Sequence, residues 1–268
     1  MTLAEYHAHP ALSRSRLWKL HESPQKFKYA EEHPEDPTPA FRLGAAFHKF
    51  TLEPETFDDE YVHMPKVDRR TREGKAVYEA FLERAGSRTI LSYDEVETVV
   101  GMRNALMANP TAKKLVEIGQ KEQSFFWTNP RTNLDLKCRP DIYITGNGPD
   151  LIVDLKSTTS SDTKSFTNEC LRCGYDVQSA FYVEGLKTVY PDADFTFMFI
   201  AVEKNPPYAV NVMEMSRDMV EYGKVRFEEL LMKYQECRAS GNWYGYNGAD
   251  NEVNKIELPA WAIKEEEE

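Results

Sequence analysis

The sequence predicts an α/β protein in which helices flank a central mixed sheet behind a mainly helical N-terminal part. Three observations predict this fold. Apolar residues recur at three- and four-residue spacing between residues 14 and 108. Alternating aromatic and β-branched residues begin near residue 121. Helix and strand patterns then follow one another in a single core up to residue 239.

The N-terminal part begins with a helical pattern at residues 14–32. Ser13 and Ser15 are candidate N-caps, because a hydroxyl can accept a hydrogen bond from the first turn. Pro24 is expected to kink or split this helix, since proline lacks an N–H and clashes with the preceding turn. Residues 33–39 contain three prolines and are predicted to form a loop.

Three further helices are predicted before the sheet begins. The first covers residues 40–52, where Leu43, Phe47 and Phe50 have helical spacing. The second covers residues 71–85 and follows a polar, basic loop, and the third covers residues 92–108.

The first strands are predicted to form an antiparallel meander. Residues 122–130 and 134–145 alternate as strands around the turn NPRTN, and residues 151–158 follow the turn GNGPD. Successive strands with short connections favour antiparallel neighbours. The remaining predicted elements are helices at 162–172 and 175–189, strands at 194–204 and 208–215, and a helix at 216–239.

The chain shows no internal repeat and no linker, so we expect one domain over residues 1–262. Its mainly helical part covers 1–110, its core covers 120–240, and residues 263–268 form an acidic tail. With 41% hydrophobic and 29% charged residues, the composition is that of an ordinary globular protein. No apolar run approaches a membrane span and the N-terminus lacks the layout of a signal peptide, so a cytoplasmic location is expected.

The net charge of −11 argues against a protein that coats nucleic acid. It does not exclude one that grips DNA in a basic channel, because charge acts locally. Basic residues do cluster, as Arg14, Arg16 and Lys19 and again as Lys66, Arg69, Arg70, Arg72 and Lys75.

Four cysteines are present, and only Cys170 and Cys173 form a C-x-x-C pair. A four-thiolate metal site needs a second pair, whereas Cys138 and Cys237 stand alone. Incidental thiols are the favoured interpretation, with a metal or redox role as the alternative.

The stretch DLIVDLKST places Asp154 and Lys156 on one face of a strand, because side chains alternate along it. An unpaired buried charge is costly, so the two must pair, meet solvent or bind a charged ligand. Asp141 lies in the preceding predicted strand and can meet Asp154. Two such carboxylates form an oxygen-rich site for Mg²⁺, and a lysine beside them can offset charge on a phosphate. The alternative is a salt bridge at the sheet margin.

The order P-D followed by D-x-K is the pattern of PD-(D/E)xK nucleases, and further blocks make the resemblance more specific. Over residues 6–262 the chain resembles the RecE exonuclease (exonuclease VIII) and its phage relatives. The blocks are ALSRSRLWKLHESPQKF, LGAAFHKFTLEPETF, RRTREGK, EQSFFW, CRPDIYI, LIVDLKSTTS and YDVQSAFY, in that family's order.

This resemblance implies a restriction-endonuclease-like core and a set of site residues. His48, Asp141 and Asp154 would bind the metal with their side chains, and Leu155 with its backbone carbonyl. Lys156 would be the catalytic lysine. Glu122 would lie near the metal and hold a water or a second ion.

Other roles implied by the resemblance concern the nucleic acid. Gln178 and Tyr182 form a Q-x-x-x-Y pair that would contact the scissile phosphate or the nearby strand. The candidate DNA contacts in the basic loop are Arg69, Arg70, Arg72 and Lys75. Without the resemblance, all of these would be interpreted as ordinary surface or core side chains.

The function implied is a Mg²⁺-dependent exodeoxyribonuclease, a phosphodiester hydrolase in which Mn²⁺ can substitute and one or two ions bind. It would digest linear double-stranded DNA from its ends in the 5′-to-3′ direction. The 3′-ended single strands would serve recombination with a RecT-like annealing protein. A ring-shaped homo-oligomer, a tetramer, is also implied.

Two alternatives stay open. One is a Cas4/AddB-like single-strand or structure-selective nuclease, although this chain lacks the C-terminal cysteine group with which those relatives hold an iron–sulfur cluster. The other is a non-catalytic DNA-end-binding module, against which the joint presence of Asp141, Asp154 and Lys156 argues.

Overall fold

The computed structural model describes residues 1–34, 36–146 and 148–258. The predicted acidic tail at 263–268, and the last residues of the predicted domain, lie outside the described residues. Within the described part, no helix is long and apolar enough to cross a membrane.

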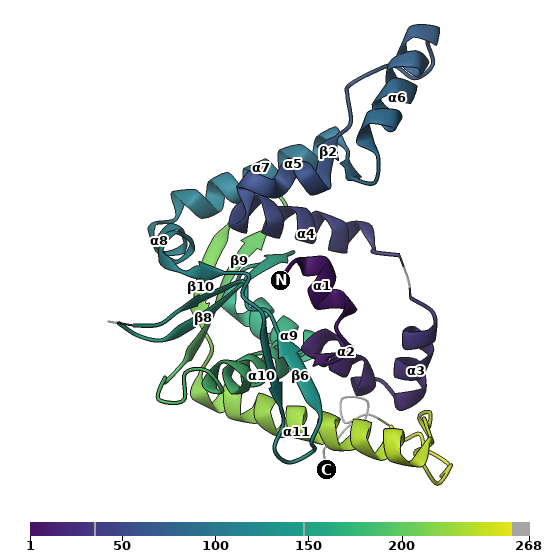
Figure 1. The fold of residues 1–268 in the computed structure, drawn as a ribbon, viewed down its shortest axis with the longest axis vertical. Coiled ribbons are helices and arrows are strands. Elements are labelled where there is room, and N and C mark those ends of the chain that lie inside the picture. Colours follow the sequence, from purple (N-terminus) through teal and green to yellow (C-terminus); the bar gives the residue numbers. More distant parts are fainter. Residues whose placement is uncertain (35, 147, 259–268) are drawn as a thin grey trace, which may run out of the picture.

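A five-stranded mixed sheet forms the centre of the molecule (Figure 1), in the order β10-β9-β8-β7-β4. β8 and β9 are parallel and the other neighbours are antiparallel. The strands are β4 (Gln120–Lys121), β7 (Ile142–Ile144), β8 (Leu151–Thr158), β9 (Thr196–Glu203) and β10 (Val210–Glu214). β8 and β9 pair over eight residues each, which is the longest ladder of this sheet.

Two smaller sheets accompany it. β5 (Phe125–Thr128) and β6 (Asp135–Cys138) form a hairpin, and β1 (Leu12–Ser13) pairs parallel with β6. β2 (Tyr61–His63) and β3 (Thr89–Leu91) form a parallel pair in the N-terminal part.

Helices cover both faces of the central sheet (Figure 1). The helices before the core are α1 (Leu3–Ala8), α2 (Arg14–Trp18), η1 (Lys19–His21), α3 (Pro24–Glu32), α4 (Pro39–Leu52), η2 (Pro54–Thr56), α5 (Phe57–Glu60), α6 (Arg72–Ala85), α7 (Tyr93–Ala108) and α8 (Pro110–Ile118). Those in the core are α9 (Thr163–Cys173), α10 (Tyr175–Lys187) and α11 (Arg217–Ser240).

The alternation of β8 divides the core into two clusters. Val153 and Leu155 point to the face that packs against α4, α7 and α8. Ile152 points to the opposite face, where it joins the cluster built by α10, α11 and the β5–β6 hairpin. Asp154 follows Ile152 by two residues, so its carboxylate is directed toward α10, among buried side chains.

The helices predicted from the sequence are confirmed, and their caps explain their limits. Ser13 caps α2 by accepting a hydrogen bond from the N–H of Arg16 at 3.4 Å, whereas Ser15 is not a cap. Pro24 splits the predicted helix and starts α3, with Ser23 as its cap.

The predicted antiparallel meander is wrong. The hairpin of β5 and β6 is confirmed, but the strand predicted over 134–145 breaks, and β7 belongs to the other sheet. Pro140 lies at this break, and a proline has no N–H with which to continue a ladder. The strand predicted over 151–158 is confirmed as β8, and Asp154 and Lys156 lie within it.

The close packing of α10 on α11 depends on Gly223. A Cβ at this position would lie 2.0 Å from the backbone carbonyl oxygen of Asp176 on α10. We therefore expect Gly223→Ala to lower the free energy of unfolding by about 2 kcal/mol or more, despite alanine's better helix propensity. Chemical denaturation checks this, with Lys224→Ala, at an exposed neighbour on the same helix, as the control. Equal stability of the two variants would contradict the expectation.

Candidate active site

The carboxylates predicted to meet lie side by side across two strands. β7 and β8 pair in a register that places Ile142 opposite Val153. One residue further out, this antiparallel register brings Asp141 opposite Asp154. Asp141 stands just before β7 and accepts a hydrogen bond from the N–H of Leu155 to Oδ2 at 2.7 Å. The P-D segment is thereby fixed to the strand that contains D-x-K.

α4 adds an imidazole to this pair. His48 Nδ1 lies 3.3 Å from Asp141 Oδ2. The helix approaches β8 closely at Gly44, where an added Cβ would lie 3.1 Å from Ser157 Oγ. The glycine and alanine residues of the LGAAFH block thus allow His48 to reach the sheet.

Asp154 is the buried centre of the site, with 3% of its surface exposed. Lys156 Nζ lies 2.5 Å from its Oδ2, and Gln178 on α10 donates from Nε2 to its Oδ1. Lys156 also donates to Gln178 Oε1 at 3.2 Å, so the amide holds both charged groups. The predicted shared face of Asp154 and Lys156 is therefore confirmed.

The charges shift one another's proton affinities. Burial would lower the pKa of His48, but the Asp141 carboxylate outweighs burial and raises it. Burial would raise the pKa of Asp141, yet His48 and Lys156 hold it below its usual value. Burial raises the pKa of Asp154, and Lys156 offsets this only in part. The site therefore favours an ionised Asp141 and disfavours a second bare carboxylate beside it.

Glu122 stands next to this group in a left-handed backbone conformation, with φ 53°. Its N–H donates to the carbonyl of Asp141 at 3.2 Å, and its Oε2 accepts from Arg139 Nε at 2.7 Å. Arg139 was not among the predicted site residues. The sequence feature that could have identified Arg139 as a site residue was its place in CRPD, two residues before Asp141.

The environment of Glu122 predicts that the free energy of unfolding depends on pH. Burial, together with the charge of Asp141, raises its pKa to about 7. The folded protein therefore binds more protons than the unfolded chain between pH 4.5 and about 7, and Glu122 lowers stability as the pH rises through this range. With divalent ions chelated, we expect wild type to lose up to about 3 kcal/mol relative to Glu122→Gln over this range. Denaturation at stepped pH values checks this, and parallel pH curves would contradict it.

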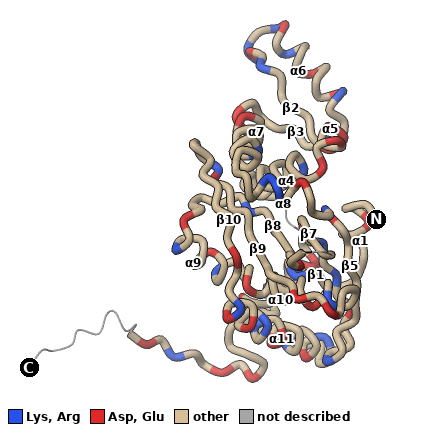
Figure 2. The backbone as a smooth tube through the Cα atoms, turned by 90° about the vertical axis from the view of Figure 1, so that its left-hand side faces the viewer, with Lys and Arg blue, Asp and Glu red and all other residues tan. Residues whose placement is uncertain are grey.

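The other predicted residues lie in two places. Tyr182 on α10 is half-buried and packs against the cluster that contains Phe197. This burial raises the pKa of the Tyr182 hydroxyl. Arg69, Arg70, Arg72 and Lys75 lie at the start of α6, which projects from the rest of the protein (Figures 1 and 2). All four are exposed, Arg70 pairs with Asp68, and Arg69 lies over the ring of Tyr78. The structure does not bring this basic group to Asp154.

One carboxylate oxygen of this group is well suited to bind a divalent cation. Asp154 Oδ2 is buried, and its ion-pair partner is the ammonium group of Lys156, 2.5 Å away. A buried carboxylate oxygen is a suitable ligand for a hard cation. Among the described residues, however, no three His, Cys, Asp or Glu side chains are gathered closely enough to hold a metal ion.

The cysteines take no part in this arrangement. All four are free, and Cys138, Cys170 and Cys237 are buried. Cys170 and Cys173 lie on α9, as the helical pattern around them indicated.

A family model decides the assignment of the chain. The model described as "PDDEXK-like domain of unknown function (DUF3799)" matches residues 13–253. The chain belongs to this family. The PDDEXK-like membership confirms the predicted superfamily, and together with the mixed sheet and its flanking helices it confirms the predicted fold class.

A solved structure agrees with this fold. A crystal structure described as a putative exonuclease from Eubacterium rectale has 13% identity and a TM-score of 0.63, covering 97% of this chain and 96% of that one. A crystal structure of a protein called SSO0001 has 14% identity and a TM-score of 0.39, covering 87% and 82% of the two chains, and supports no argument. No curated protein matches the chain.

Proposed function

We propose that this protein is a Mg²⁺-dependent exodeoxyribonuclease that digests linear double-stranded DNA from its ends. The observation on which the proposal rests is the meeting of Asp141, Asp154, Lys156 and His48 in a PDDEXK-like chain. The likeness to a protein described as a putative exonuclease supports it. The 5′-to-3′ direction and the release of 3′-ended strands for recombination come from the resemblance to RecE-type exonucleases.

His48, Asp141, Asp154 and the carbonyl of Leu155 would hold the ion, with Mn²⁺ as a substitute and Glu122 near a second position. When bound, the ion supplies Lewis-acid activation of water and neutralises phosphate charge. The burial of the Asp154 carboxylate beside Lys156 supports its place in this set. Chelation followed by return of Mg²⁺ is expected to abolish and then restore hydrolysis.

Lys156 and Gln178 would contribute to the reaction without binding the ion. Lys156 presents a positive charge beside Asp154, where it can stabilise charge developing on a phosphate oxygen. Gln178 contacts both groups, so it keeps the lysine aligned with the carboxylate. Its amide oxygen accepts from Lys156 and its amide nitrogen donates to Asp154. We therefore propose a positioning role for Gln178 in addition to the phosphate contact inferred from sequence.

The remaining partners are proposed from the resemblance. Tyr182 and the basic group at the start of α6 would contact DNA, and a homo-oligomeric ring would enclose it. A RecT-like annealing protein would receive the product strand. Basic residues facing such a channel would reconcile DNA binding with the net charge of −11.

The test is digestion of a linear duplex labelled at its 5′ or its 3′ end, with and without Mg²⁺, beside a closed circle. We expect Mg²⁺-dependent release of the 5′ label as nucleotides or short fragments, and an intact circle. Cutting of the circle would support the Cas4/AddB-like alternative and contradict digestion from ends.

A second candidate function is a non-catalytic DNA-end-binding module. It is favoured by one observation, since no three metal-binding side chains are gathered among the described residues. Binding of duplex ends without nucleotide release in either Mg²⁺ or Mn²⁺ would establish this alternative.

A further inference from the structure

A row of positively charged side chains, each placed against an aromatic ring, leads away from Lys156. The ammonium group of Lys156 lies 4.4 Å from the ring centre of Tyr175. The guanidinium of Arg14 lies 5.9 Å from the same ring and 5.4 Å from that of Trp18. The guanidinium of Arg226 lies 4.9 Å from the ring centre of Trp18. The row thus joins the candidate active site on β8 to α11 through α2.

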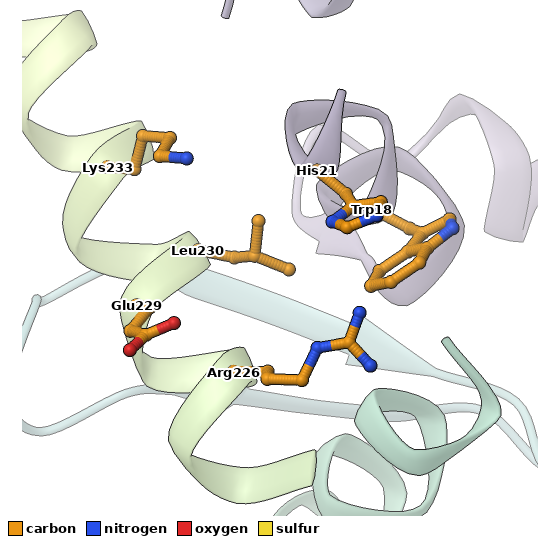
Figure 3. Close-up of a pocket in the computed structure, with 6 residues that line it drawn as sticks. All are labelled: Trp18, His21, Arg226, Glu229, Leu230 and Lys233. Carbon is orange, nitrogen blue, oxygen red and sulfur yellow. The ribbon is translucent and has the colours of Figure 1, made fainter. Parts of the chain in front are cut away.

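A small cavity of about 80 Å³ lies at the far end of this row, between η1 and α11 (Figure 3). It is lined by Trp18, His21, Arg226, Glu229, Leu230 and Lys233. Arg226 extends from α11 toward the indole of Trp18, and Lys233 extends from the same helix toward the side that holds His21 (Figure 3). The imidazole of His21 stacks on the indole at 4.3 Å with an interplanar angle of 12°. These three cations, Lys156, Arg14 and Arg226, together with Lys233 at the cavity, are called the cation row below.

The cation row is held in place by buried groups. Asp176 is fully buried and accepts a hydrogen bond from Arg226 Nη1 at 2.7 Å. Arg14 donates to the backbone carbonyl of Cys173. Its Nε is buried without a hydrogen-bond partner. These contacts fix the guanidinium groups before any ligand arrives, which reduces the entropy lost on binding.

Two members of the cation row lack a carboxylate partner within the described part of the chain, whereas Lys156 pairs with Asp154 and Arg226 with Asp176. Among residues 1–34, 36–146 and 148–258, neither Arg14 nor Lys233 forms an ion pair with a carboxylate. Glu229 is the single acidic side chain that lines the cavity. In a chain of net charge −11, such a row is an exception that favours an anionic ligand with several charges in line.

We propose that the cation row is a track for the phosphates of one nucleic-acid strand. The strand whose reacting phosphate lies at Lys156 continues across Arg14 and Trp18, and a further phosphate enters the cavity beside Arg226 and Lys233. The proposal rests on the proposed nuclease function, because it takes Lys156 as the start of the track.

The size of the cavity indicates which part of the strand enters it. A volume of about 80 Å³ is small and favours a phosphate group over a nucleobase. The Trp18 ring already contacts His21, Arg14 and Arg226, so it orients cations and is not a stacking platform for bases. The contacts are therefore to the backbone and are independent of base sequence.

The experiment compares Lys233→Gln with Lys224→Gln in binding a fluorescent single-stranded oligonucleotide, with Ca²⁺ in place of Mg²⁺. Lys224 is exposed and stands nine residues earlier on α11, which places it on the opposite side of the helix. We expect Lys233→Gln to weaken binding about three- to tenfold and to reduce the slope of log affinity against log salt by about 0.7. Lys224→Gln is expected to bind as wild type, and Lys233→Arg is expected to retain the affinity.

Equal affinities of the two glutamine variants would overturn the proposal. So would binding of inorganic phosphate in a Lys233-dependent manner without binding of the oligonucleotide, because the site would then take a free anion. The readout does not need hydrolysis. A selective loss in Lys233→Gln, in a protein that releases no nucleotides with Mg²⁺, would therefore support the track while contradicting the proposed function.

Discussion

Asp154→Asn is expected to reduce Mg²⁺-dependent nucleotide release on the order of a thousandfold. The substitution keeps the shape of the side chain and an oxygen for Gln178, which donates to Oδ1. It removes the negative charge that a divalent cation and Lys156 both require. Release of acid-soluble label from a linear duplex measures the effect.

The control for this variant is Asp162→Asn. Asp162 is exposed, caps α9 by accepting from the N–H of Ser165 at 2.9 Å, and can be replaced by asparagine without loss of the cap. It should retain wild-type activity. Near-wild-type hydrolysis by Asp154→Asn, in a folded protein, would show that the site proposed here is wrong.

Lys156→Met is expected to affect activity and stability together. The loss of a positive charge next to the phosphate should lower the hydrolysis rate roughly a hundredfold or more. With divalent ions chelated, the buried carboxylate of Asp154 is left without its cation, which costs about 3 kcal/mol of unfolding free energy.

The sign of the pH dependence distinguishes this loss from general damage. Burial raises the pKa of Asp154, and removal of Lys156 removes the group that opposes the rise. The folded variant then binds a proton that the unfolded chain releases, so its stability falls as the pH rises above the unfolded value. Denaturation in chelator should show a larger loss at alkaline than at acid pH.

Two companion variants complete this test. Lys164→Met, at an exposed lysine of α9, should leave both activity and stability unchanged. The double variant Asp154→Asn with Lys156→Met should recover stability without recovering activity, because no buried charge is left unpaired. A Lys156→Met protein as stable as wild type at every pH would contradict the buried ion pair.

Local patterns explain why most elements were predictable. The 3.6-residue period of residues 40–52 and the alternation of LIVDLKST report on one element at a time, so each predicts its own helix or strand. The same alternation predicted that Asp154 and Lys156 share a face. α8 was not predicted, although Asn109 and Pro110 are typical of a helix start. The β2–β3 pair was missed because strands of three residues depend on packing.

The arrangement of the strands could not be obtained in this way. Pro140 signalled an interruption, but a hairpin and a strand of a second sheet have the same local pattern as a meander. The ion pair of Glu122 with Arg139 could not be predicted from the sequence either, because its energy depends on burial that only the folded chain creates.

By itself, the sequence determined the α/β class, the limits of most elements and the chemistry of the D-x-K strand, because these depend on residue type and spacing. The tertiary structure alone decided that Asp141 lies opposite Asp154, that Gln178 joins Asp154 to Lys156, and that the cation row extends to α11. Those contacts join residues distant in the chain, and they form only when both core clusters are packed.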